Sequence, residues 1–320
     1  MSDFVVAEEN GTPAFYALGQ FPLAGGGHAR VGRWNGAGWT PVGDSINGEA
    51  NSLTHAVIDH EPTLFVAGDL VVSPGINTAL AALRNGVWTP VDGAADGSSP
   101  RGQSVGTGID PASGKRIVFV SGRLDANPIP LGFVRSLHEP MRKVLGLGVS
   151  DWPRSMVSMQ DGLNVGPTVY MNGRMRLIGE DWVSLPSRPD APARDMVVAS
   201  PGVEQPLLFA AGDFDRIFTP SGQVPVNGFA AFDGEAWFVP GGGFIGYATS
   251  LAVGADEVVY VGAMVEAPVD EERPAVFAWD GAALTELPGL DASGSVDDLV
   301  VYDSGGGAAL YAIGRDLLGA

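Results

Sequence analysis

The sequence contains no cysteine, which excludes a disulfide framework and any metal site held by thiolates. Charged residues make up only 17% of the 320 residues, and lysine occurs only at Lys115 and Lys143. Acidic residues outnumber basic ones by 37 to 18, so the formal net charge is -19. A field of this sign repels phosphate backbones and anionic bilayer surfaces, and nucleic acid and membrane insertion are therefore not expected.

Long apolar runs are also lacking. Residues 1–9 do not show a basic segment followed by an apolar one, and no window approaches about eighteen apolar residues. The sequence therefore predicts neither a signal peptide nor a transmembrane segment within residues 1–320. If residues 1–320 are a fragment of a longer protein, an extracellular or cell-surface location stays open.

Glycine and proline are abundant instead, with 46 and 24 residues, and they punctuate the whole chain. No stretch keeps the 3.6-residue apolar spacing of a helix, and the best helical candidate, residues 137–147, is interrupted by Pro140. This mixture is typical of many short strands joined by turns, so the fold class predicted is all-β.

One short pattern, an apolar run that ends in glycine and a polar residue, returns seven times. Its marker positions are Gly19, Gly68, Gly122, Gly173, Gly212, Ala263 and Gly314. The successive spacings are 49, 54, 51, 39, 51 and 51 residues, so the period is about fifty. An apolar strand precedes each marker run in the clearer copies.

A second pattern follows in phase, in which Asn-Gly or Asp-Gly joins two strands. It occurs at Asn35, Asn85, Asp233 and Asp280. These dipeptides supply the positive φ values of tight hairpin turns, so each unit is predicted to hold four antiparallel strands. The units are residues 1–50, 51–102, 103–154, 155–193, 194–248, 249–296 and 297–320, the last with two strands only.

Four short strands repeating every fifty residues favour a single β-propeller domain over residues 1–320, because each blade buries its faces only against its neighbours. Seven blades with an incomplete last one are predicted, and six blades plus a separate hairpin is the alternative. A pair of immunoglobulin-like sandwiches would not explain a period that runs through both domains. We expect the open strand edge of the last unit to invite self-association or a partner strand.

The units resemble kelch-like propeller repeats, closest to those of the cortical cell-polarity marker type and related bacterial repeat proteins. Residues 208–213, residues 232–234 and Trp237 carry the resemblance best, and the turn signals are blurred in the third and fourth units. The resemblance implies architecture more than activity.

Motifs that signal catalysis do not find support in their surroundings. Residues 102–106 match the G-x-S-x-G nucleophile elbow, yet no helix is predicted to follow. The four histidines, at positions 28, 55, 60 and 138, lack metal-ligand spacing. No catalytic residue and no metal ligand are therefore assigned.

Two glycine triplets, residues 25–27 and 241–243, do not follow the spacing of a phosphate-binding loop. Acidic loops at residues 92–96, 213–215 and 291–298 offer oxygen ligands for calcium, but none matches the EF-hand pattern. Solvated acidic turns explain these loops, so no cofactor is assigned.

The residues that follow the marker positions, together with a nearby acidic residue, are the candidates for a ligand-binding face. They are Asp69, Arg123, Arg174, Asp213, Asp215 and Arg315. If the units follow one another in a ring, Asp69 is expected to face Arg123, and Arg174 to face Asp213. The longest insertions, residues 125–130, 215–227 and 266–274, fall on the same face, where loops carry function.

Three functions remain open on this basis. The first is a non-enzymatic binding or protein-interaction module that takes a protein or a glycan on the loop-rich face. The second is a propeller enzyme, such as a glycan hydrolase or lyase, whose carboxylates converge only in space. The third is a structural piece of a larger cell-surface assembly.

Overall fold

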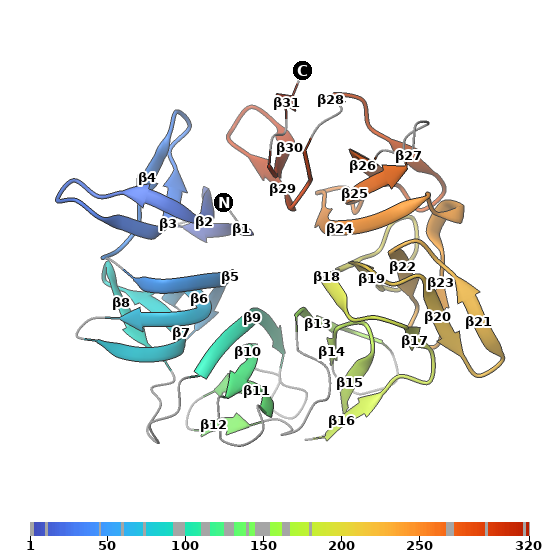
Figure 1. The fold of residues 1–320 in the computed structure, drawn as a ribbon, viewed down its shortest axis with the longest axis horizontal. Helices are drawn as coiled ribbons and strands as arrows, with labels where there is room; N and C mark the ends of the chain where they lie inside the picture. Colours follow the sequence, from blue (N-terminus) through green and yellow to red (C-terminus); the bar gives the residue numbers. More distant parts are fainter. Residues whose placement is uncertain are drawn as a thin grey trace. The chain divides into compact units, whose positions relative to one another are not determined.

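A computed structural model of the chain shows an all-β protein built from antiparallel sheets (Figure 1). The described residues are 3–9, 12–44, 46–58, 61–72, 75–91, 100–109, 116–124, 131–138, 141–144, 154–161, 167–178, 181–266, 272–291, 294–315 and 318–319. Within these ranges the one helical element is a 3-10 turn, Pro240–Gly242, and no helix is long and apolar enough to cross a bilayer.

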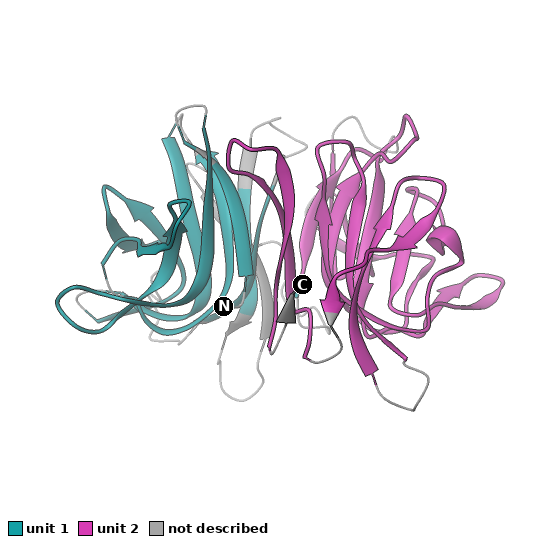
Figure 2. Ribbon diagram, turned by 90° about the horizontal axis from the view of Figure 1, so that it is seen from above, with its two compact units in different colours: residues 1–154 teal, residues 155–320 magenta. Residues whose placement is uncertain are grey.

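The chain divides into two compact units, Met1–Arg154 and Ser155–Ala320 (Figure 2). Their boundary coincides with the predicted boundary between the third and fourth sequence units. In chain order, the first three repeated sheets belong to unit 1 and the next four belong to unit 2.

Unit 1 holds three four-stranded sheets, each with its strands in chain order. The first sheet contains β1 (Asp3–Glu9), β2 (Thr12–Pro22), β3 (His28–Trp34) and β4 (Trp39–Pro41). The second contains β5 (Asn47–Ile58), β6 (Glu61–Val72), β7 (Ile76–Arg84) and β8 (Val87–Pro90). The third contains β9 (Pro100–Ile109), β10 (Arg116–Leu124), β11 (Leu131–His138) and β12 (Met141–Val144).

Unit 2 repeats the same strand order. The fourth sheet contains β13 (Met156–Met159), β14 (Thr168–Met171), β15 (Met175–Ile178) and β16 (Asp181–Ser184). The fifth contains β18 (Ala193–Ala199), β19 (Leu207–Gly212), β22 (Phe229–Phe232) and β23 (Trp237–Phe238). The sixth contains β24 (Gly246–Val253), β25 (Val259–Glu266), β26 (Glu272–Trp279) and β27 (Leu284–Glu286). The seventh contains β29 (Asp298–Asp303) and β30 (Ala308–Ile313).

Two small sheets accompany these repeats in unit 2. A hairpin of β20 (Arg216–Thr219) and β21 (Gly222–Pro225) is inserted between β19 and β22, and β20 pairs with β17 (Arg188–Pro189). The second small sheet pairs β28 (Leu290–Asp291) with β31 (Leu318–Gly319). The hairpin accounts for the predicted insertion at residues 215–227.

The marker runs of the sequence form the second strands of all seven sheets, which confirms the strand predictions at these places. Within each unit the hydrophobic core lies between successive sheets. Phe65 and Ala67 of the second sheet pack with Val120 of the third, and Phe209 of the fifth packs with Val261 of the sixth. Successive side chains of β6 point to opposite faces: Leu64 and Val66 pack with the first sheet, and Phe65 and Ala67 pack with the third. Both faces of the second sheet are therefore covered.

A bulge recurs opposite the marker position in four sheets. One extra residue of the first strand is left without a partner at Asn51, Gln103, Arg194 and Thr249. The first strand therefore runs across the predicted unit boundary rather than starting there: β5 begins at Asn47 and β9 at Pro100. Bulges redirect side chains and increase the local twist, and in β18 the bulge residue is Arg194.

The Asn-Gly and Asp-Gly dipeptides do lie between the third and fourth strands, but only one forms a two-residue turn. Asn85 and Gly86 both have positive φ, 52° and 77°, between the paired Arg84 and Val87. The other three loops span four residues. In the loop that begins at Asp280, its carboxylate accepts hydrogen bonds from the backbone N–H groups of Ala282 and Ala283. Residues 137–147, the best helical candidate, contribute to strands β11 and β12 where they are described.

Candidate functional site

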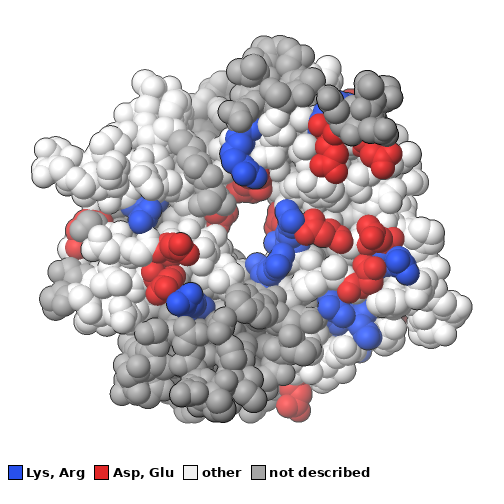
Figure 3. All heavy atoms as spheres, in the orientation of Figure 1, with Lys and Arg blue, Asp and Glu red and all other residues white. Residues whose placement is uncertain are grey.

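The candidate site lies where the fifth and sixth sheets meet, at the marker end of their strands. It consists of Arg194, Asp213, Tyr247 and Glu272, called here the junction cluster. Arg194 is the bulge residue of β18, Asp213 follows β19, Tyr247 is near the start of β24, and Glu272 begins β26. In this part of unit 2, acidic side chains lie beside basic ones on the surface (Figure 3).

A tight ion pair forms one half of the cluster. The Nε and Nη2 atoms of Arg194 lie 2.9 and 2.5 Å from the same carboxylate oxygen, Oδ2, of Asp213. The two side chains are 42% and 46% exposed, so solvent and ligands reach both. The bulge places Arg194 here, because Ala193 pairs with Gly212 and Asp195 with Ala211, which leaves Arg194 as the extra residue opposite the end of β19.

Tyr247 and Glu272 form the other half. The phenol of Tyr247 donates a hydrogen bond of 3.5 Å to Oε2 of Glu272. Burial, followed by the negative charge of Glu272, raises the pKa of Tyr247 above its usual value, and Asp213 adds to this while Arg194 opposes it. The phenol is therefore protonated at neutral pH and acts as a hydrogen-bond donor.

Glycine allows the two sheets to approach closely at this point. Gly228, just before β22, has φ of 71°, and a Cβ atom there would lie 2.6 Å from the backbone nitrogen of Ala248 and 3.0 Å from Cα of Tyr247. Its N–H donates to the carbonyl of Phe214, which closes the base of the inserted hairpin. Any larger residue would push β24 away and widen the junction cluster.

The equivalent positions in unit 1 carry different chemistry. Asp69, which follows Gly68, lies 3.6 Å from Nε of Arg101, and Arg101 holds in β9 the place that Tyr247 holds in β24. Asn51, the bulge residue of β5, donates from Nδ2 to the carbonyl of Gly102 at 2.8 Å. Both contacts join the second sheet to the third.

The remaining predicted residues are placed as follows. The backbone of Arg123 lies in β10 opposite Arg101, and its side chain is outside the described set. Arg174 lies in the turn before β15, where its N–H donates to Met171. The N–H of Asp215 donates to Oδ1 of Asp190 at 3.1 Å.

Arg315 lies 3.9 Å from Asp297, a pair with the opposite polarity to that of Arg194 and Asp213. The residue after the marker position therefore pairs within its own sheet in the fifth and seventh repeats. Asp213 pairs with Arg194, and Asp69 pairs with Arg101. The side chain of Arg123 lies outside the described residues, so the expected pairing of Asp69 with Arg123 stays a prediction, as does that of Arg174 with Asp213. The bulge in β18 places Arg194 beside Asp213, and this bulge was not apparent from the sequence.

A repeated hydrogen bond joins successive sheets just beyond the bulge, and sequence reasoning missed it. Asp3 accepts from the N–H of Leu53 at 2.6 Å, and Ser52 accepts from that of Val105 at 3.3 Å. In unit 2, Asp195 accepts from Leu251 at 2.7 Å. We call these three contacts the ladder bonds. In each ladder bond the acceptor of one sheet binds the backbone N–H of the next sheet, at the residue directly after the equivalent Asp or Ser. Asp3, for example, binds Leu53, which follows Ser52.

The signal for the ladder bonds is present in all seven sequence units, as Asp or Ser directly before an apolar residue. These residues are Asp3, Ser52, Ser104, Ser155, Asp195, Ser250 and Asp298. Not every one makes the bond: Ser155 instead donates to the carbonyl of Ala193 at 3.3 Å, and the hydroxyl of Ser250 has no hydrogen-bond partner among the described residues. Asp195 also accepts from its neighbour Met196, and burial raises the pKa of its carboxyl although both backbone N–H bonds lower it.

Tryptophan makes a second contact between sheets at their outer strands. Nε1 of Trp88 in β8 donates to the carbonyl of Val42, just after the first sheet, at 3.2 Å. Nε1 of Trp237 in β23 donates to the carbonyl of Ser187, just after the fourth sheet, at 3.0 Å. Both indoles are buried, so these bonds fix the outer strands as the ladder bonds fix the inner ones.

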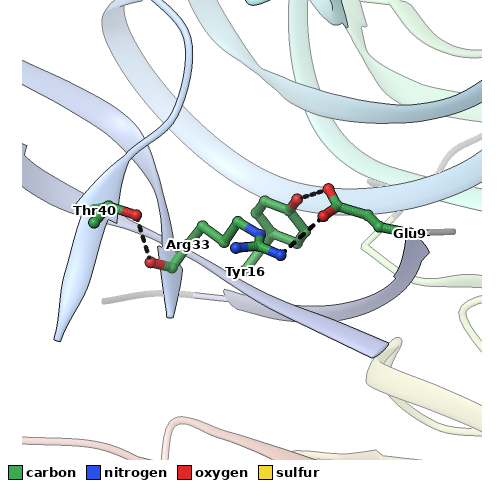
Figure 4. Close-up of polar contacts among 4 residues, drawn as sticks. All are labelled: Glu9, Tyr16, Arg33 and Thr40. Atoms are coloured by element: carbon green, nitrogen blue, oxygen red, sulfur yellow. Dashed lines mark hydrogen bonds and ion pairs between the residues drawn. The ribbon is translucent and has the colours of Figure 1, made fainter. Parts of the chain in front are cut away.

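A different polar group lies at the other end of the first sheet (Figure 4). Tyr16 donates its hydroxyl proton to Glu9, and Nη2 of Arg33 lies 3.0 Å from the same carboxylate. Tyr170 and Asp161 repeat the tyrosine-carboxylate bond at 2.8 Å in the fourth sheet. Burial and the carboxylate raise the pKa of both tyrosines, so each phenol stays protonated. Each hydroxyl on these buried strands thereby has a hydrogen-bond partner.

The motifs that might indicate catalysis have structural positions. Ser104 of the G-x-S-x-G match lies in the middle of β9 and is buried, and strand continues after it. Within the described ranges, no group of three or more His, Asp or Glu side chains is arranged to hold a metal ion. Of the predicted calcium loops, residues 92–96 lie outside the described residues, and so do 292 and 293.

The fold and site define an all-β repeat protein with several four-stranded antiparallel sheets and an exposed polar cluster. No family model matches the sequence, and no curated protein matches it. Among solved structures, the exotype rhamnogalacturonan lyase YesX is similar with a TM-score of 0.46 and 10% identity, over 90% of this chain and 64% of that chain. The chain thus spans less than two thirds of the lyase, and the likeness carries no conclusion about activity.

Proposed function

We propose that the protein is a non-enzymatic binding module that takes a glycan at the junction cluster. The observation that carries this proposal is the exposed pair of Arg194 and Asp213 beside the phenol of Tyr247. A sugar hydroxyl both donates and accepts hydrogen bonds. It can therefore bridge a guanidinium, which only donates, and a carboxylate, which only accepts.

The surrounding groups support the same ligand class. Tyr247 is protonated at neutral pH and offers an aromatic face together with a donor. Next to Glu272, Arg273 forms a bidentate pair with Glu286, with distances of 2.5 and 2.9 Å. Donors and acceptors thus alternate without one sign prevailing, which suits a hydroxyl-rich ligand better than a phosphate.

The architecture we propose is a single kelch-like β-propeller of seven blades, in which each sheet is one blade and the last is incomplete. Three observations support it: the fifty-residue period through both units, the uniform strand order, and the ladder bonds between successive sheets. In such a ring the junction cluster lies on the loop-rich face, beside the inserted hairpin. A crystal structure with the seven sheets in one closed ring is the expected result, and two separately placed sandwiches would contradict it.

A glycan array with the whole chain tests the binding proposal. We expect saturable binding to a defined set of glycans, and Tyr247→Ala and Asp213→Asn should each weaken it about tenfold or more. The matched control is Asp69→Asn, which changes the equivalent residue of unit 1 and should leave the affinity unchanged. Absence of binding to every glycan, or an equal loss in the control, would overturn the assignment.

A further inference from the structure

The second strand of the seventh sheet differs from its six counterparts. In the other sheets the second strand is paired on both sides, with a first and a third strand. β30 pairs with β29, and among the residues that the structure describes no strand pairs with its other side. Its residues are partly or fully exposed, whereas β19 is buried from Leu208 to Gly212.

The backbone of β30 has hydrogen-bonding groups that point to the open side. The carbonyl of Ile313 accepts from the N–H of Asp297, so it faces β29. Because the N–H and C=O groups of successive residues alternate in direction, those of Leu310 and Ala312 face away from β29. The repeat agrees, because Gly212, the counterpart of Gly314, uses its N–H to bind the carbonyl of Gly228 on the third-strand side.

The edge also lacks the devices that usually protect an open strand. Residues Ala308–Ile313 read AALYAI and contain no charge and no proline. Natural sheets commonly place charged residues or proline on an unpaired edge to prevent further pairing. An apolar edge without them is a template for an added strand.

The sixth sheet indicates what kind of strand fits. Leu310 packs in one cluster with Val276 of β26 and with Leu287, which follows β27. Leu290 of β28 belongs to the same cluster, so an added strand would lie beside the two outer strands of the sixth sheet and next to β28. A single extended segment is the occupant that we expect there. Its expected pattern is that of this chain's own third strands, which are rich in small and apolar residues.

The sixth sheet also offers a contact for a fourth strand added to the seventh sheet. The N–H groups of Leu287 and Val42 make the same bond to the third strand of their own sheets. The carbonyl of Val42 receives the indole of Trp88 from the next sheet. The carbonyl of Leu287 holds the corresponding position next to the seventh sheet, and a tryptophan of an added fourth strand would reach it.

We propose that the open edge of β30 is a binding site for an extended polypeptide strand with the sequence pattern of this protein's third and fourth strands. The strand pairs antiparallel with β30 through Leu310 and Ala312, and its apolar side chains cover the seventh sheet. This interaction surface is separate from the junction cluster.

A synthetic peptide of residues 76–90, which form β7 and β8 in the second sheet, is the probe. We expect it to bind the whole chain saturably in a fluorescence anisotropy titration and to slow hydrogen exchange at Leu310 and Ala312. A peptide of the same composition in scrambled order should not bind. Ala312→Pro removes the outward N–H without breaking the pairing to β29, and it should weaken binding about tenfold.

Gly306→Ala, in the exposed turn of the same hairpin, is the matched variant that should leave the affinity unchanged. Binding that survives Ala312→Pro, or exchange protection elsewhere, would overturn the proposal. So would sedimentation as a dimer in which the amides of Leu310 and Ala312 are already protected, because a second copy would then fill the edge.

Discussion

The junction of the second and third sheets in unit 1 and the junction of the fifth and sixth sheets in unit 2 occupy the same place in the repeat. The inner contact is the same in both, a Ser or Asp that accepts from the next sheet's backbone: Ser52 in one, Asp195 in the other. The surface contacts differ. Asp69 reaches across to Arg101, while Asp213 is held by Arg194 of its own sheet.

This difference separates scaffold from site. The ladder position keeps a side-chain acceptor in both junctions, because a buried backbone N–H must have a partner. The bulge position and the position after the marker are free to vary, and in unit 2 this variation leaves Tyr247 available to a ligand. Loss of the shared contact should therefore cost the most stability, and loss of the variable contacts the least.

The largest effect is expected from removing the ladder acceptor. Asp195→Ala leaves the N–H groups of Leu251 and Met196 without their acceptor and should lower the free energy of unfolding by about 2 to 3 kcal/mol. Ser52→Ala removes one longer bond and should cost about 1 kcal/mol. Chemical denaturation measures both. An equal cost at the two junctions would contradict the stronger role of the carboxylate.

The tryptophan contacts should be next in size and similar in the two units. Trp88→Phe and Trp237→Phe each remove the indole N–H from a backbone carbonyl and leave a small void. We expect each to lower the free energy of unfolding by about 1 to 2 kcal/mol. Thermal and chemical unfolding of the pair of variants check this, and a loss in one unit only would show that the outer contact is not a shared feature.

The two junctions should also respond differently to pH. The pKa of Asp195 is raised by burial from 3.8, so the folded state binds this proton more tightly than the unfolded chain does. The carboxyl's contribution to stability is therefore fully present below about pH 3.8 and declines as the pH rises through the raised pKa.

The cost of Asp195→Ala should consequently grow as the pH is lowered through this window, whereas the cost of Ser52→Ala should stay constant. Denaturation curves of both variants and the unmodified chain between pH 3 and 7 are the measurement, a range of about four units chosen around the ordinary carboxyl pKa. A cost of Asp195→Ala that shrinks on acidification would show that the pKa is lowered instead.

The smallest effect concerns the exposed ion pairs. A double-mutant cycle on Arg194 and Asp213 should give a coupling energy of about 0.5 to 1 kcal/mol, because two nitrogens contact one carboxylate oxygen at short range. The cycle on Arg101 and Asp69, at 3.6 Å, should give less. A larger coupling in unit 1 would reverse this ranking.

The sequence allowed much of the fold to be predicted, because the marker runs carry strong local signals. An apolar run such as residues 64–70 must be a buried strand, and Asn85-Gly86 is a two-residue turn by its own chemistry. The four-residue loops at Asn35, Asp233 and Asp280 were not distinguished from it. There the side chain accepts two backbone N–H groups and so stabilises a longer loop.

The site was predicted only in part. Asp213 was identified from its place after the marker glycine, but Arg194, Tyr247 and Glu272 were not. Their proximity depends on the bulge at Arg194 and on the close approach of β24 at Gly228, and both are set by packing between sheets rather than by local pattern. The Asp or Ser before the apolar residue of each unit was a readable signal that went unused.

Hydrogen exchange at three amides tests the claim that the ladder bonds join the repeats. Leu53, Val105 and Leu251 should exchange slowly in the unmodified chain, and Asp3→Ala, Ser52→Ala and Asp195→Ala should each speed exchange at its own partner amide beyond any general change. If the three amides respond alike to every variant, or not at all, the contact between successive sheets is not made through these side chains.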